Sequence, residues 1–366
     1  MNFDFSDDQN VLREEVRKFL VNKSPLGEAR QVMDTGLGHS AAVWQGLCEM
    51  GVTTLMLPEN CGGHGLGALE LCVVAEEVGR QLAPVPLVST MYLAVQAILL
   101  AANAAQQQAW LPRIADGQVA TLAAPLSSSH ADAAALPRFD GKALHGVAPL
   151  VVDGEAAALA VVLAQGDDDR QVLVLAESGR GVSRRRLASI DPTRGFAQLQ
   201  FDATPAEALD GDARAVLTQV RDRAAILLAF EQLGGADSAL AMGAAYARER
   251  KAFGRAIGSY QGIKHKLADI YTRNEMARAH CYYGAWALSS DAPELAAAAA
   301  AARIAATDAF SYAAQENLQT HGGMGYTWEM DCHLYYRRAR QLAVVLGSRH
   351  EWSERLVCEL EARLSA

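Results

Sequence analysis

The stretch RERKAFGRAIGSYQGIKHKLAD, residues 248–269, decides how the rest of this sequence is interpreted. Basic side chains surround an aromatic residue, Phe253, and the preceding helix is predicted to end near Gly254. The guanidinium of Arg250 can offer two parallel donors to a diphosphate, and Phe253 can lie against an adenine or a ribose. Taken alone, the stretch fits a helix C-cap followed by a turn at least as well.

A second glycine-containing stretch, QENLQTHGGMGYTWE, covers residues 315–329. Gly322 and Gly323 carry no side chain, which lets a ligand approach the backbone. Gln319 offers both a donor and an acceptor to an amide-like ring edge. This stretch alone is also compatible with an ordinary helix end and turn.

The composition limits the possible classes of protein. The chain has 366 residues, of which 51% are hydrophobic, enough for one large domain or two to three smaller ones. A formal net charge of −9 argues against non-specific nucleic-acid binding, because phosphate attraction requires a basic face. Six cysteines without CxxC pairing or nearby histidine ligands indicate free thiols in a reducing compartment and no metal site.

No targeting or membrane segment is expected. The N-terminal stretch MNFDFSDDQNVLREE is acidic and amphipathic, unlike a signal peptide. The longest apolar run, at 92–105, contains Gln96 and Asn103 and is shorter than a membrane span. We therefore predict a cytoplasmic protein.

Three zones of different character follow one another along the chain. Residues 1–118 predict helices, the first one capped by Ser6. Residues 119–210 contain short strand-like runs at 157–164, 170–177 and 196–201, which predict a small antiparallel barrel or sheet. Residues 211–366 return to long alanine-rich helices. The expected fold class is α+β and mostly helical.

Together, in this order and spacing, the two glycine-containing stretches resemble the acyl-CoA dehydrogenase family. The resemblance covers nearly the whole chain and includes MNFDFSDDQNVLREEVRKFL (1–20), WQGLCEMGVTTLMLPENCGGHGLGALELCVVAEEVGRQLAPVP (44–86) and QTHGGMGYTWEMDCHLYYRRAR (319–340). It implies an N-terminal helical domain (1–118), a β-barrel domain (119–210) and a C-terminal four-helix bundle (211–366). It also implies a tetramer built as a dimer of dimers, bound FAD, α,β-dehydrogenation of an acyl-CoA thioester, and an electron-transfer flavoprotein as acceptor.

The resemblance also assigns residues to the cofactor. In the family, a neighbouring subunit holds the ADP half of FAD through the motifs R-x-F-G-x-x-I…Q and Q-x-x-G-G. The matching positions here are Arg250, Phe253, Gln261, Gln319, Gly322 and Gly323. In the reaction, a carboxylate removes the α-proton, the flavin takes a hydride from the β-carbon, and polarisation of the thioester oxygen acidifies the α-carbon.

The chain departs from the family where the base and the flavin ring are expected. Leu346 stands where many members have the catalytic glutamate, and Ala224 stands at the alternative base position. In the β zone, Ala148 and Leu150 replace a lysine and an aromatic residue beside the flavin, although serines 127–129 still offer hydroxyl groups.

Three hypotheses follow. The first is a non-catalytic subunit of a heteromeric (α2β2) bacterial acyl-CoA dehydrogenase, which completes the FAD site of a base-bearing partner. The second is a self-sufficient homo-oligomer with a relocated base. Glu231, two turns after Ala224 in an apolar setting, is the leading candidate for this base. A buried ion pair with an Arg or Lys explains a glutamate at this position equally well. Glu351 and His350 are weaker candidates for the base. The third is a binding or scaffold protein without redox activity.

Overall fold

The structure is a computed structural model that describes residues 4–127, 136–167 and 170–364. It divides into two compact units, each built from separate stretches of sequence. The first unit comprises Met1–Gly27, Ala68–Ala83 and Ala225–Ala366, and the second comprises Glu28–Gly67 and Pro84–Ala224. The predicted boundaries at residues 118 and 210 follow sequence character and stay a prediction.

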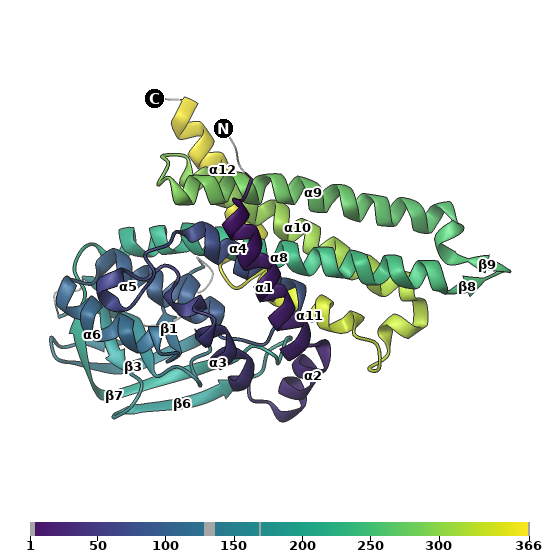
Figure 1. The fold of residues 1–366 in the computed structure, drawn as a ribbon. Helices are drawn as coiled ribbons and strands as arrows, with labels where there is room; N and C mark the ends of the chain where they lie inside the picture. The colour runs from purple at the N-terminus through teal and green to yellow at the C-terminus, as the bar shows by residue number, and fades with distance from the viewer. Residues whose placement is uncertain (1–3, 128–135, 168–169, 365–366) are drawn as a thin grey trace. The chain divides into compact units, whose positions relative to one another are not determined.

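The first unit is helical (Figure 1). Its elements are α1 (Asp7–Lys23), α4 (Ala68–Arg80), most of α8 (Ala213–Glu249), β8 (Lys251–Ala252), β9 (Arg255–Ala256), η4 (Ile257–Ser259), α9 (Gln261–Ser289), α10 (Leu295–His321), η5 (Gly322–Tyr326), α11 (Cys332–Leu342) and α12 (Arg349–Leu364). The predicted cap of α1 is confirmed, because the Ser6 hydroxyl accepts from the Gln9 amide while the Gln9 side chain accepts from the Ser6 amide.

Helices α4 and α8 cross through glycines on both sides. A Cβ added at Gly79 would overlap the carbonyl oxygen of Glu231, and a Cβ added at Gly234 would overlap the carbonyl oxygen of Glu76. Only glycine allows the two backbones to approach this closely. The crossing therefore fixes the position of α4 on the bundle.

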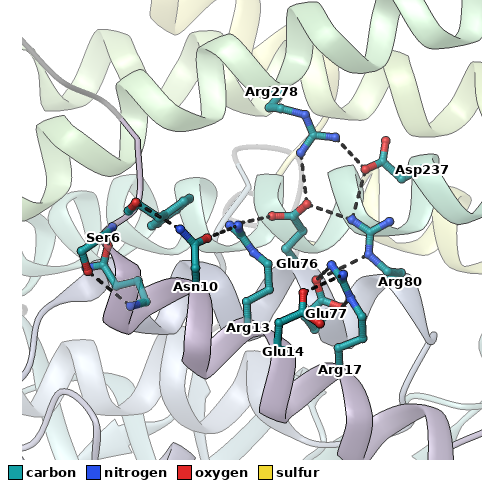
Figure 2. A network of polar contacts seen from close by, with 12 residues as sticks. Ser6, Asn10, Arg13, Glu14, Arg17, Glu76, Glu77, Arg80, Asp237 and Arg278 are labelled. Atoms are coloured by element: carbon teal, nitrogen blue, oxygen red, sulfur yellow. Dashed lines mark hydrogen bonds and ion pairs between the residues drawn. The ribbon is translucent and has the colours of Figure 1, made fainter.

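A network of charged side chains joins the same helices (Figure 2). The Arg278 guanidinium of α9 donates to Asp237 of α8 at 2.6 Å and to Glu76 of α4 at 3.1 Å. Arg80 bridges the same two carboxylates at 3.0 and 3.2 Å. On the α1 side the network includes Arg13, Arg17 and Glu77. Burial lowers the pKa of Arg278, but Asp237 and Glu76 outweigh this effect and raise it, so this cation stays charged.

The second unit combines short helices with a β-sheet. Its helices are α2 (Leu26–Thr35, which starts at the end of the first unit's sequence), α3 (Ala41–Glu49), η1 (Val52–Thr54), η2 (Glu59–Cys61), the π-helix η3 (Val88–Ala94), α5 (Val95–Ala101) and α6 (Ala104–Ala115). Its strands are β1 (Ala120–Ala123), β2 (Arg138–Phe139), β3 (Ala143–Val152), β4 (Leu159–Gln165), β5 (Gln171–Glu177), β6 (Val182–Leu187) and β7 (Phe196–Ala208).

The sheet closes into a barrel. Its strand order is β1-β4-β2-β3-β7-β5, an additional β4–β5 pairing closes the ring, and β6 pairs with β7. The three strands predicted from apolar runs are confirmed as β4, β5 and β7. Alternate side chains fill the interior, among them Leu144, Val151, Val162, Val174 and Leu199. The predicted fold class, mostly helical with a central barrel, is confirmed, but the expectation of a wholly antiparallel sheet is wrong, since β4 pairs in parallel with β1 and β2.

Two consecutive hydroxyl groups anchor the π-helix η3 within this unit. The Ser89 hydroxyl donates to the buried carboxylate of Asp153 at 2.7 Å. The Thr90 hydroxyl donates to the Ala120 carbonyl and accepts from the Ala120 amide, both at 3.2 Å.

Among the described residues, no helix has the length and apolar content needed to cross a membrane.

Candidate functional site

The end of α8 differs from the prediction. The helix ends at Glu249 rather than near Gly254, and an antiparallel hairpin of β8 and β9 follows it. Phe253 and Gly254 form the turn, with φ values of +51° and +81°. Positive φ at both central positions is the geometry of a type I′ turn, which a phenylalanine adopts only at a cost of about 1 kcal/mol.

Contacts from the following residues hold this hairpin in place. The Ile257 amide donates to the Arg250 carbonyl at 2.8 Å, and the Tyr260 hydroxyl donates to the Ala252 carbonyl at 3.0 Å. These bonds satisfy backbone groups that a longer helix would have satisfied internally, which explains the early helix end. The hairpin projects from the end of the bundle in Figure 1.

The side chains proposed for the dinucleotide are exposed here. Phe253 is 96% exposed, and the side chains of Arg250 and Gln261 also face solvent. Within the described part of the chain, the Arg250 guanidinium has no ion-pair or hydrogen-bond partner, whereas Arg255 stacks over Tyr260 at 4.0 Å. A cation and an aromatic ring therefore remain available at this hairpin for a ligand.

The second stretch ends α10 and forms η5. Gly322 caps the helix with φ +60° and ψ −140°, a conformation essentially restricted to glycine. A Cβ at Gly322 or Gly323 would meet no atom within 4 Å, so this backbone faces open space. The Tyr326 hydroxyl donates to the Oε1 of Gln319 at 3.3 Å, which orients the exposed amide.

The structure brings these two stretches together. The rings of Tyr246 and His321 stack with centroids 4.1 Å apart and an angle of 27° between their planes. Tyr246 lies one turn before Arg250, and His321 directly precedes Gly322. Neither ring is among the cofactor residues predicted from the sequence. The available signal is the four-residue spacing from Tyr246 to Arg250, which is one helical turn, and the Arg250 amide donates to the Tyr246 carbonyl just beyond the end of α8.

The family base position is apolar and buried. Leu346 is 0% exposed, and its carbonyl accepts from the indole of Trp352 at 3.1 Å. Ser348 and Glu351 form a capping box at the start of α12, in which the Glu351 carboxylate accepts from the Ser348 amide at 2.6 Å. Glu351 therefore serves as a helix cap, and His350 is exposed.

The alternative base candidates lie inside α8. Ala224 and Glu231 are both 0% exposed. The Glu231 Oε1 accepts from the guanidinium of Arg338, itself buried, at 3.3 Å. Glu231 therefore has a buried arginine partner, which is the structural alternative to a role as base. The predicted site residues otherwise stay predictions.

The residues predicted to face a flavin ring offer few polar groups. On β3, Ala148 is buried and Leu150 is half exposed, and neither side chain can form a hydrogen bond. Ser127 is buried, while serines 128 and 129 lie outside the described residues. The described residues contain no cluster of three or more histidine, cysteine or acidic side chains suited to a metal.

Comparisons with known proteins give a consistent result. The model of the acyl-CoA dehydrogenase N-terminal domain matches residues 6–118, and that of the C-terminal domain matches residues 214–350. The acyl-CoA dehydrogenase IpdE2 of Mycobacterium tuberculosis is 35% identical over 355 residues, covering 97% of this chain and 98% of that protein.

Two solved structures extend this similarity to three dimensions. A variant of the Tcur3481–Tcur3483 steroid ACAD superposes with a TM-score of 0.87 and 30% identity, covering 98% of this chain and 99% of the other. The ChsE4–ChsE5 complex from Mycobacterium tuberculosis gives a TM-score of 0.89 and 25% identity, covering 99% of both chains.

Proposed function

Because this chain belongs to the acyl-CoA dehydrogenase family, we propose that it serves α,β-dehydrogenation of an acyl-CoA thioester as the base-lacking subunit of a heteromeric enzyme. In this assignment the chain completes the FAD site of a partner chain that bears the catalytic base. The expected assembly is an α2β2 tetramer, with an electron-transfer flavoprotein as electron acceptor.

One contrast carries the proposal. The side chains suited to the ADP half of FAD are exposed, and Arg250 has no partner among the described residues. The positions where the family carries its base hold Leu346 and Ala224, both buried and neither ionisable. The residues present therefore fit the dinucleotide tail of FAD but do not fit its ring or the proton transfer.

The chemistry of each residue defines its role. Arg250 would place its planar guanidinium against the diphosphate, where bidentate donation is strongest. Phe253 would cover the adenine or ribose, and the Gln319 amide would hydrogen-bond to the cofactor. The open backbone at Gly322 and Gly323 would contact it without interference from side chains. Bound FAD would supply the hydride acceptor, while the partner would supply the base and polarise the thioester.

The comparisons support the heteromer. Both solved structures described above carry the names of two different chains, and one is named a steroid ACAD. An acyl-CoA carrying a steroid-derived side chain is therefore the first substrate class to test. A straight-chain acyl-CoA of similar size serves as its comparison.

The two alternatives have less support. A self-sufficient enzyme would require Glu231 to accept a proton while its carboxylate is held by the buried guanidinium of Arg338. A scaffold without redox chemistry leaves the free cation and the exposed ring at the hairpin without a role. Purification of the chain alone and together with a partner chain distinguishes both alternatives from the proposal.

The test compares the chain alone with the chain co-expressed with base-bearing acyl-CoA dehydrogenase chains. We expect the lone chain to lack FAD and turnover, and the complex to hold about one FAD per pair of chains because each pair has one complete site. Full flavin occupancy and turnover by the lone chain would overturn the proposal. A colourless complex in excess FAD would favour the scaffold.

A matched pair of variants tests the site itself. Arg250→Ala in the complex should weaken FAD binding by about tenfold or more, because a charge-assisted bidentate contact is lost. Arg248→Ala removes the same charge from an equally exposed position two residues earlier, on another face of the helix. It should leave FAD binding close to that of the unmodified complex.

A further inference from the structure

The ring pair Tyr246–His321 lies directly beside Arg250 and Gly322, while an ion pair of Lys266 with Glu316 at 2.6 Å joins the same two stretches further along their helices. One ring comes from the last turn of α8 and the other is the final residue of α10. The residues proposed to bind the dinucleotide follow directly after each of these two helix ends.

The His321 ring is fixed on both of its sides. It is 4% exposed, and its Nδ1 lies 2.9 Å from the Asn317 carbonyl oxygen. Since a carbonyl only accepts, Nδ1 carries the proton and donates to the last turn of α10. One face of the ring then stacks on Tyr246, so His321 connects its own helix end to α8.

The backbone that follows packs against the same histidine. A Cβ added at Gly325 would overlap the Leu318 carbonyl and lie 3.0 Å from the His321 Cβ. At the end of α8, the Arg250 amide donates to the Tyr246 carbonyl at 2.8 Å, so the base of the hairpin begins at the stacked tyrosine. Both FAD-binding stretches are therefore built directly on the ring pair.

We propose that His321 and Tyr246 are positioning residues that pre-organise Arg250 and the Gly322–Gly323 backbone as one clamp for the dinucleotide. This inference rests on the proposed function. Neither ring needs to touch the cofactor. Their contribution is to hold the two arms of the clamp before binding, which lowers the ordering cost that binding otherwise carries.

The experiment uses the assembled complex and four variants of this chain. His321→Ala and Tyr246→Ala each remove one ring, while Tyr246→Phe keeps the stack without the hydroxyl. His333→Ala is the control, because it removes a ring that stacks on Trp328, 4.8 Å away in the same segment, and leaves the Tyr246–His321 pair intact. FAD binding is measured by flavin fluorescence. Amide hydrogen exchange of residues 250–257 and 322–326 is measured in the lone chain.

His321→Ala and Tyr246→Ala should weaken FAD binding by about tenfold and speed exchange in both segments, while Tyr246→Phe and His333→Ala stay near the unmodified protein. Unchanged FAD binding in His321→Ala, with Arg250→Ala still defective, would overturn the inference and leave the proposed function standing. If Arg250→Ala also binds FAD normally, the proposed function fails. In that case, hydrogen exchange of the His321→Ala and Tyr246→Ala variants tests the coupling of the two arms by itself. Exchange that is unchanged, or that is faster in only one of the two segments, refutes this coupling.

Discussion

Glu231 of α8 and Arg338 of α11 form an ion pair inside the helical unit, with Oε1 and Nη1 3.3 Å apart and exposures of 0% and 1%. Arg338 also donates to the Leu82 carbonyl at 3.4 Å, just beyond the end of α4. The carboxylate therefore helps to hold three helices together. A proton-abstracting group needs access to its substrate, and this geometry favours a structural role.

Replacing Glu231 separates these two roles. Glu231→Gln should lower the free energy of unfolding by about 3–5 kcal/mol, since it removes one member of a buried ion pair. Turnover per folded complex should not change. Denaturant unfolding and steady-state oxidation of an acyl-CoA measure the two quantities. Glu354→Gln, at an exposed site on α12, is the control, and a loss of turnover without a loss of stability would restore Glu231 as a base.

The crossing of α4 and α8 predicts a strong dependence on glycine. Gly234→Ala should destabilise the protein by several kcal/mol, because its methyl group would overlap the Glu76 carbonyl and the helices would have to separate. Gly262→Ala, in α9, meets nothing within 4 Å and should stabilise by about 0.5–1 kcal/mol through helix propensity. Thermal unfolding of the two variants should shift in opposite directions, and equal shifts would contradict this packing.

Asp153 predicts a pH-dependent stability in the barrel unit. Burial raises the pKa of this carboxyl, against the opposing effects of Arg194, Ser89, His39 and the Gly195 amide. A raised native pKa means that the folded state binds more protons, so stability falls as pH rises from the unfolded value near 4 through the native one. Asp153→Asn removes this loss, and its stability relative to the unmodified protein should therefore increase with pH across that window.

Asp140 provides a control of opposite sign. Hydrogen bonds from the Ala143 and Lys142 amides lower the pKa of this exposed carboxyl. Its stabilising contribution is present above the unfolded pKa and is lost as pH falls through the native one. Asp140→Asn should therefore become relatively less stable as pH rises through the same region. Urea titrations at a series of pH values check both signs, and parallel curves for the two variants would contradict the assignment.

The thiols should differ sharply in reactivity. Cys358 is exposed on α12, whereas burial raises the pKa of Cys72 and Cys281 and raises that of Cys332 to about 11. Because the thiolate is the reacting species, native protein should show a fast labelling phase of about one thiol per chain. Cys358→Ser should abolish that phase in a disulfide-exchange assay. A fast phase that persists in this variant would contradict the expected protection of the other five thiols, of which half-buried Cys48 is the most accessible.

Much of the fold follows from short-range patterns. The Ser6–Gln9 capping box depends on a three-residue spacing, and the apolar runs that became β4, β5 and β7 need only a neighbouring strand to bury them. The residue types at the motif positions are also fixed by the sequence. The absence of a carboxylate at Leu346 and Ala224 needs no structure to establish.

The tertiary structure decided what the motif residues can do. The helix was predicted to end near Gly254, but it ends at Glu249. Ile257 and Tyr260 donate hydrogen bonds to the Arg250 and Ala252 carbonyls, and this hairpin places Phe253 at a positive φ that a phenylalanine disfavours. Only the packed bundle pairs Glu231 with Arg338 and stacks Tyr246 on His321, residues 107 and 75 positions apart. The sequence alone thus determined which chemical groups exist, because composition and local spacing encode them. Which groups meet was decided by tertiary packing, because contacts between distant segments depend on how whole helices fit together.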